Sequence, residues 1–280
     1  MKGKNAISRI VAGAAVPGLM ALCVPGSLFG QASNPNRIAI LRWYAANQTT
    51  SVTVGSMPVG IAFDGANIWV ANWLLNTVTK LRAGDGAVLG TFGTGTAANM
   101  VAFDGANIWV TNNGSANVST LRATDGTLLG TFPVGTLPAG VAFDGANIWV
   151  ANSTSNNVTK LRASDGATLG TFPVGNYPSG VAFDGANIWV ANEHGNNVVK
   201  LRASDGAYLG KFAVGTYPNG VVFDGSSIWV ANFYTNNVTK LRPSDGALLG
   251  TFTVGVNPWG LAFDGANIWV THWSGTVSKL

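Results

Sequence analysis

From about residue 58 onward, apolar and polar residues alternate in short runs that return every forty positions. The string FDGANIWV occurs at 63–70, 103–110, 143–150, 183–190 and 263–270, and FDGSSIWV stands at 223–230. Within one unit, four runs rich in Val, Ile, Phe, Trp and Thr are separated by turn residues, at 140–143, 147–152, 157–162 and 168–174. Asp-Gly pairs join the first run to the second and the third to the fourth, as tight turns between strands do. Each unit is therefore predicted to be a four-stranded antiparallel meander.

Forty residues and four strands per unit are typical of a β-propeller blade, with a solenoid as the competing repeat architecture. The second run is apolar on both faces, because Trp149 alternates with Ile148 and Val150. Such a strand belongs between two neighbouring sheets, which favours the propeller. Pro173 in the fourth run cannot donate a hydrogen bond to a sheet, so this run is predicted to be the outermost strand and the first run the innermost.

The number of repeats predicts an all-β, six-bladed propeller of four-stranded antiparallel blades. Residues 36–55 are in phase with the forty-residue repeat and match its third and fourth strands, whereas the chain ends at 276–280 inside a third strand. We therefore expect the N-terminal outer strand, at about 50–54, to close the ring by pairing with the C-terminal blade. The third strand of that blade is then supplied twice, by 37–43 and by 276–280, so one copy is displaced or the chain is a fragment of a longer protein.

The start of the chain has a different pattern. Residues 1–9 carry three positive charges, and the next fifteen residues are apolar and uncharged. This is the pattern of a secretion signal, and cleavage is expected after Ala32. Residues 1–32 are thus predicted to be a signal peptide and residues 33–280 a single propeller domain, in a secreted or periplasmic protein without a membrane span in the mature chain. An uncleaved anchor is the alternative.

Removal of the signal changes the charge and the cysteine content. The chain has 16 Lys and Arg against 12 Asp and Glu, and three of these cations stand in residues 1–9, so the mature chain is nearly neutral. A neutral chain gives no electrostatic basis for binding nucleic acid. The only cysteine, Cys23, leaves with the signal, so the fold must be held by core burial without a disulfide. We expect a monomer without a cofactor.

The run IWVTN at 108–112, followed by NVSTLRATDG and later by FPVGTLPAGVAFDG, resembles the YVTN/YncE-like and NHL-type β-propellers. The resemblance covers residues 36–280 and implies the propeller fold. It says little about activity, because these propellers include surface and periplasmic binding proteins, and their relatives include streptogramin lyases.

The repeats differ from one another mainly in the loops after their second and fourth strands, which lie on one face of a propeller. Loops on a rigid scaffold are where binding usually resides. The candidate ligand-binding residues on this face are Trp73, Tyr177, Glu193, His194, Tyr217, Phe233, Tyr234, Trp259, His272 and Trp273. Because blade 6 neighbours blade 1 in a closed ring, a continuous arc is expected from Trp73, Tyr217, Phe233, Tyr234, Trp259 and Trp273. Exposed aromatic rings suit a glycan, peptide or protein ligand, and the alternative is that they shield the loops.

The remaining motifs are interpreted as parts of the scaffold. The tryptophan of each repeat is predicted to lie in the core between blades, and the Lys and Arg of each VTKLR motif on a solvated, charge-balanced rim. The repeated Asp residues are expected to form turns, because no turn gathers the several acidic oxygens that calcium needs. No metal site is predicted.

A binding or interaction module is the favoured function. The sequence has no nucleophile elbow, no HExxH motif and no phosphate loop. One open alternative is an enzyme like the streptogramin lyases, for which only Glu193, His194 and His272 are available as general acid and base. The other is a structural component of the cell envelope or surface.

Overall fold

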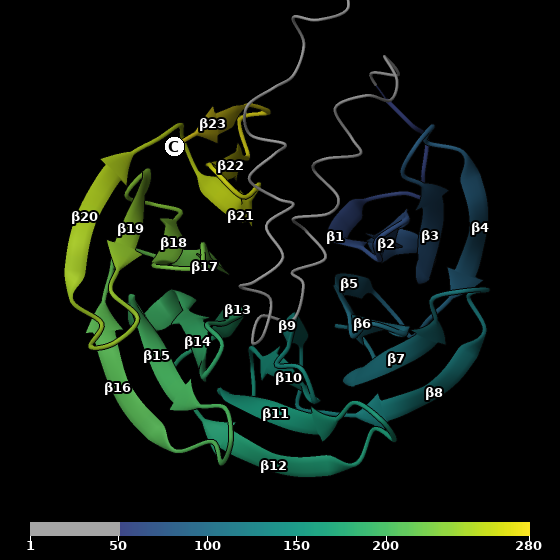
Figure 1. Ribbon diagram of the computed structural model, residues 1–280, viewed down its shortest axis with the longest axis horizontal. Coiled ribbons are helices and arrows are strands. Elements are labelled where there is room, and N and C mark those ends of the chain that lie inside the picture. The colour runs from purple at the N-terminus through teal and green to yellow at the C-terminus, as the bar shows by residue number, and fades with distance from the viewer. Residues whose placement is uncertain (1–50) are drawn as a thin grey trace, which may run out of the picture. The chain divides into compact units, whose positions relative to one another are not determined.

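The computed structural model describes residues 51–280, which form six antiparallel sheets. The strands of each sheet are hydrogen-bonded in sequence order, and successive sheets contact one another around a central axis (Figure 1). The prediction of a six-bladed β-propeller is confirmed. Residues 1–50, which include the predicted signal peptide and the segment 37–43, lie outside the described residues.

The blades are bounded as follows. Blade 1 holds β1 (Pro58–Phe63), β2 (Asn67–Asn72), β3 (Thr77–Arg82) and β4 (Val88–Gly93), and blade 2 holds β5 (Ala98–Phe103), β6 (Asn107–Asn112), β7 (Asn117–Arg122) and β8 (Leu128–Pro133). Blade 3 holds β9 (Pro138–Phe143), β10 (Asn147–Asn152), β11 (Asn157–Arg162) and β12 (Thr168–Pro173), and blade 4 holds β13 (Pro178–Phe183), β14 (Asn187–Asn192), β15 (Asn197–Arg202) and β16 (Tyr208–Ala213). Blade 5 holds β17 (Pro218–Phe223), β18 (Ile228–Asn232), β19 (Asn237–Leu241) and β20 (Leu248–Thr253), and blade 6 holds β21 (Pro258–Phe263), β22 (Ile268–His272) and β23 (Val277–Lys279). The short 3-10 helices η2 (Trp73–Leu75) and η3 (Glu193–Gly195) follow the second strands of blades 1 and 4. Among the described residues no helix is both long and apolar enough to span a membrane.

The repeated string FDGANIWV folds into the end of the first strand, a turn and the second strand. In blade 3, the Oδ1 atom of Asp144 accepts the backbone N–H groups of Ala146 and Asn147 at 2.9 and 2.6 Å. Its Oδ2 atom accepts the indole N–H of Trp149 at 2.8 Å. The aspartate therefore forms the turn, as predicted, and also fixes the ring that follows it.

Tryptophans from the second strands fill the space between neighbouring blades. Trp149 packs with Ile188, Val190 and Leu201 of blade 4, and its ring lies 5.5 Å from that of Phe172. The predicted core role is confirmed at positions 69, 109, 149, 189 and 229, where the side chains are 0 to 7% exposed. Trp269 of blade 6 is 38% exposed.

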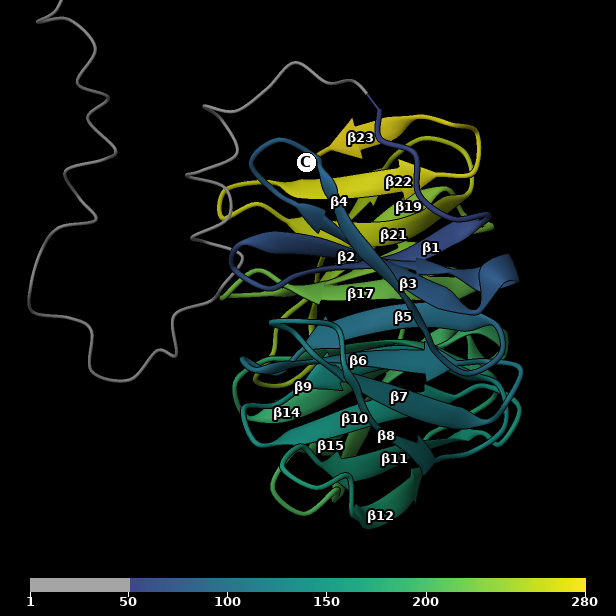
Figure 2. The ribbon, with the colours of Figure 1, turned by 90° about the vertical axis from the view of Figure 1, so that its right-hand side faces the viewer.

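The meander places the two sets of turns on opposite faces. Figure 2, viewed from the side of the ring, shows the strands running between the two faces with connections at both ends. The Asp-Gly turns follow the first and third strands, and the variable loops follow the second and fourth. We call the face of the variable loops the loop face and the opposite face the turn face.

The predicted rim of charged residues is right for the arginines and wrong for Lys80, Lys160 and Lys200. Arg162 pairs with Asp165 at 2.8 Å, and both side chains are about half exposed. Lys160 is instead buried, and its Nζ atom donates to the backbone carbonyls of Ala203 and Ser204 in the next blade. The lysine is long enough to reach a partner 43 residues further along the chain, which local sequence patterns do not reveal.

The C-terminal end of the repeat array shows which segment supplies the third strand of the last blade. β23 pairs with β22, so residues 276–280 supply the third strand of blade 6. Residues 51–54 form no strand, but Val52 lies against Gly86 of blade 1, the place that Phe92 takes against Gly126 one blade later. This contact keeps Val52 in phase with the fourth strands. The closing pair with blade 6 is not among the ladders of residues 51–280, so ring closure stays a prediction.

Candidate functional site

A repeated backbone arrangement positions the side chains of the loop face. The residue before each innermost strand has a positive φ, and in blade 4 this residue is Tyr177, at 56°. The Tyr177 carbonyl accepts the N–H of Glu193 at 3.0 Å, while its own N–H is donated to Oδ1 of Asn156 in the preceding blade at 2.9 Å. A left-handed backbone is costly for a tyrosine and persists because its neighbours hold it. Tyr217 repeats the arrangement one blade later, with Asn196 and Phe233 as partners.

Seven rings of the loop face, Tyr177 and Tyr217 among them, form a continuous surface feature, which we call the aromatic strip. Its members are Tyr177, His194, Tyr217, Phe233, Tyr234, Trp259 and Trp273. Ring centroids are 4.6 Å apart between Tyr177 and His194 and 5.6 Å apart between His194 and Tyr217. Tyr217 lies 5.0 Å from Tyr234 and 5.8 Å from Phe233. Phe233 lies 5.7 Å from Trp259, which lies 5.5 Å from Trp273.

The strip matches the predicted arc only in part. Five of the six residues expected in the arc belong to it, and it extends further than expected through His194 to Tyr177. Trp73, in η2 of blade 1, makes no ring contact with the strip within residues 51–280. The strip therefore runs over blades 4, 5 and 6 and stops before blade 1.

Glu193 is buried and stands directly before His194 of the strip. Asn219 of β17 donates from Nδ2 to the Oε1 atom of Glu193, which ties the loop of blade 4 to the innermost strand of blade 5. Burial raises the pKa of the Glu193 carboxyl, and hydrogen bonds from Tyr217 and Asn219 partly oppose this effect. The pKa of Tyr217 is raised well above its ordinary value by burial and by its hydrogen bond to Glu193. The carboxyl thus holds the loop that carries His194 against the innermost strand of blade 5.

His272 does not reach the loop surface. It is buried, and it stands where the other five blades have a buried asparagine, at positions 72, 112, 152, 192 and 232. Its Nε2 atom lies 2.9 Å from Oγ of Ser278, which replaces the bond from Asn232 to Thr239 in blade 5. Burial lowers the pKa of the His272 imidazole. This candidate is therefore part of the scaffold of blade 6.

The lowered pKa makes stability depend on pH in a defined direction. Below pH 6.5, the unfolded chain binds a proton at this histidine more readily than the folded chain, so stability falls as pH falls. His272→Asn is expected to remove this loss, because asparagine fills the same position in the other blades. Thermal midpoints of the unaltered chain and the variant would be measured from pH 4.5 to 7.5. The midpoint of the unaltered chain should fall further below that of the variant as the pH is lowered. Parallel curves would contradict a buried, neutral imidazole.

Several residues that position the site were not predicted from the sequence. Asn156, Asn196 and Asn236 each accept the N–H of a residue in the next blade, 21 positions further on. Asn219 stands directly after the proline of its innermost strand, at a position that varies among the repeats. The first set is recognisable by its recurrence every forty residues, whereas the partner of Glu193 follows only from the contact between blades.

The loop face is almost free of formal charge. The loops that follow the second and fourth strands contain no Asp, Lys or Arg, and their only titratable side chains besides tyrosines are Glu193 and His194. The Asp-Gly turns and the Arg–Asp pairs all belong to the turn face. Within residues 51–280, no three His, Cys, Asp or Glu side chains gather into a group that could hold a metal ion. The loop face thus offers rings, hydroxyls and amides.

Comparison with known proteins supports the fold. No protein-family model matches the chain, and no curated protein matches its sequence. Among solved structures, a streptogramin B lyase is similar with a TM-score of 0.70 at 18% identity, over 83% of this chain and 85% of that one. The virginiamycin B lyase from Staphylococcus aureus, as its selenomethionine form, gives a TM-score of 0.67 at 18% identity, over 80% and 83% of the two chains. A protein of unknown function from Desulfotomaculum acetoxidans gives 0.66 at 19% identity, over 81% and 86%. At these identities the likeness shows the propeller fold alone.

Proposed function

We propose that the protein is a binding module that holds a neutral glycan on the aromatic strip. The observation that carries the proposal is the unbroken contact of seven rings across three blades. Flat aromatic faces pack well against the apolar C–H faces of sugar rings, at little cost in side-chain entropy. Trp273 and Tyr234 expose 70% and 62% of their surfaces, so these two rings are open to a ligand.

The chemistry of the surrounding loops favours a neutral ligand. A charged ligand would meet no exposed side chain of opposite charge on these loops apart from His194, because Glu193 is buried. The neighbouring Thr, Ser and Asn side chains can donate to and accept from sugar hydroxyls. The test must therefore distinguish a glycan ligand from a peptide ligand. Export by residues 1–32 and membership of the YVTN/YncE-like propellers belong to the same proposal and rest on the sequence patterns.

The test is binding of neutral oligosaccharides by the full mature chain. Gluco-, manno-, xylo- and chito-oligosaccharides of four to six sugars would be titrated calorimetrically, alongside uncharged peptides of similar length. At least one sugar series is expected to bind. Trp273→Ala and Trp259→Ala are expected to weaken it about 30-fold, which corresponds to about 2 kcal/mol per anchoring ring.

Trp73→Ala is the matched control. Trp73 lies in a loop of the same face but outside the strip, so its removal is expected to change affinity less than about threefold. Equal losses in all three variants would show that the strip is not the binding surface. Binding of peptides without binding of any sugar would contradict the glycan proposal and keep the strip as a binding surface.

A further inference from the structure

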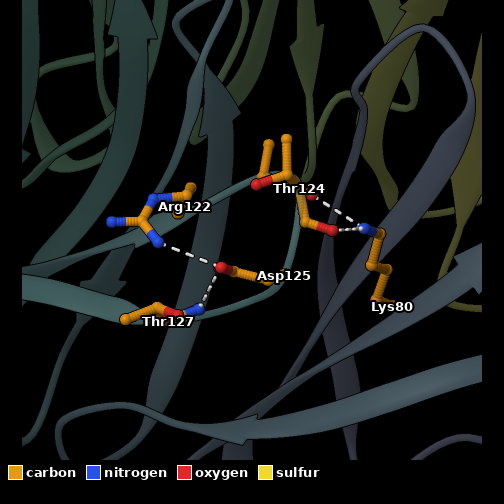
Figure 3. A network of polar contacts seen from close by, with 6 residues as sticks. Lys80, Arg122, Thr124, Asp125 and Thr127 are labelled. Carbon is orange, nitrogen blue, oxygen red and sulfur yellow. Dashed lines mark hydrogen bonds and ion pairs between the residues drawn. The ribbon is translucent and has the colours of Figure 1, made fainter.

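Three buried lysines reveal a recurring ammonium site on the turn face. Lys80, Lys160 and Lys200 stand in the third strands of blades 1, 3 and 4 and are 6 to 7% exposed. The Nζ atom of Lys80 donates to the backbone carbonyls of Ala123 and Thr124, at 2.7 and 2.9 Å (Figure 3). The same ammonium lies 5.1 Å from the centre of the Trp69 ring in its own blade. Two carbonyl oxygens and an aromatic face thus hold a cation that is removed from water.

The other two lysines repeat this geometry closely. Lys160 donates to the carbonyls at positions 203 and 204 at 2.7 and 3.0 Å, and Lys200 to those at 243 and 244 at 2.6 and 3.3 Å. Their ammonium groups lie 5.0 and 5.3 Å from the rings of Trp149 and Trp189. The site is therefore a property of the repeat and not of one blade.

Blade 2 has a threonine where the other blades have the lysine. Thr120 is 5% exposed, and its Oγ1 atom is buried without a hydrogen-bond partner. Counting forty positions onward from blade 1, the counterparts of its two carbonyls and its ring are the carbonyls of Ala163 and Ser164 and the Trp109 ring. Within residues 51–280 no side chain donates to these two carbonyls, and no lysine lies over the Trp109 ring.

A hollow marks this place on the turn face. It lies between blades 2 and 3 and is lined by residues that include Asp104, Asn107, Phe143, Ala163 and Ser164. The corresponding hollow between blades 1 and 2 is lined by the residues forty positions earlier, together with Lys80. The volumes are about 630 Å³ for the first and 390 Å³ for the second. The larger hollow is the one that no lysine enters.

We propose that the hollow between blades 2 and 3 binds the ammonium group of a small primary amine. A lysine side chain exceeds that of threonine by two methylene carbons and the ammonium group, so ethylammonium, which has the same number of heavy atoms, is the probe. Its nitrogen would donate to the carbonyls of Ala163 and Ser164, as lysines do at the equivalent carbonyls in three other blades. The Asp104 carboxylate in the lining adds negative charge, while Arg162 at the edge is engaged by Asp165 at 2.8 Å.

The test is titration of the mature chain with ethylammonium chloride at constant ionic strength, by calorimetry and thermal unfolding. A ligand of three heavy atoms binds no more tightly than on the order of 1 mM, so one saturable site in the millimolar range is expected. Ethylammonium at ten times its dissociation constant should raise the thermal midpoint of unfolding by about 3 °C. Tetramethylammonium chloride, which has no N–H to donate, is expected to give no shift.

Two variants act on the site in opposite directions. Thr120→Lys fills the hollow with the protein's own ammonium and is expected to abolish binding and raise the midpoint. Lys160→Thr creates a second site between blades 3 and 4, so the stoichiometry should rise from one to two with a similar dissociation constant. The absence of saturable binding to the unaltered chain, or unchanged stoichiometry in folded Lys160→Thr, would overturn the proposal. Two further titrations distinguish the possible ligands: cadaverine represents a free amine, and Nα-acetyllysine amide represents the lysine of a protein.

Discussion

Replacing Trp149 by alanine is expected to lower the free energy of unfolding by about 4 kcal/mol, the range for removing a large aromatic side chain from a packed core. The indole is completely buried, lies against the tilted ring of Phe172 and packs against the strands of blade 4. Its removal leaves a cavity between two blades and deprives the Lys160 ammonium of the ring beneath it. Chemical denaturation of the unaltered chain and of the variant would measure the loss, provided that the two m-values agree.

Trp269→Ala is the matched control, because Trp269 occupies the same position in an identical eight-residue string. Its side chain is 38% exposed, and within the described residues no phenylalanine ring stacks on it. A loss of less than half that of Trp149→Ala is expected. Equal losses would show that blade 6 is covered in solution as completely as the inner blades, which is what the predicted ring closure through residues 50–54 requires.

The pair also shows what the repeat can and cannot reveal. The forty-residue period, the Asp-Gly turns and the strand with apolar residues on both faces were sufficient to predict the blade and the number of blades. Identical strings such as 143–150 and 263–270 carry no information about which neighbour covers them. The exposure of Trp269 therefore had to come from the structure.

Contacts between blades explain the other wrong predictions. The sequence predicts that Lys80 and Lys160 are exposed, because the backbone carbonyls that they bind belong to a turn of the next blade, more than forty residues away. The sequence predicts that Glu193 is an exposed, titratable group of a variable loop. The prediction fails because the partner of its carboxylate, Asn219, is 26 residues away. The aromatic strip was largely predictable, since loop residues forty positions apart lie side by side in neighbouring blades. The interruption falls between Trp273 of blade 6 and Trp73 of blade 1, the one junction that is not a copy of the repeated contact between blades.

Replacing Asp144 by alanine is expected to lower the free energy of unfolding by about 3 kcal/mol. The change leaves the N–H groups of Ala146 and Asn147 and the indole N–H of Trp149 without their acceptor. An unpaired buried donor costs about 1 to 3 kcal/mol, and the indole is the most deeply buried of the three. Denaturant titration of this variant, of Trp149→Ala and of the double variant would show whether the two losses overlap, as they should if the carboxylate acts through the ring.

Asp144→Asn separates the acceptor role from the shape of the side chain. An asparagine has one oxygen and one NH₂ group, so in either orientation an N–H donor faces another N–H donor of the turn or of the indole. A clear loss is therefore expected although the two side chains have the same size. Asp165→Asn is the control, because this second Asp-Gly turn is exposed and its aspartate bonds only to a backbone N–H and to Arg162. A much smaller loss is expected there, since the exposed asparagine oxygen still accepts from the turn and water replaces the ion pair. If both substitutions cost the same, the bond to the buried indole is not what makes the aspartate of the FDG turn necessary.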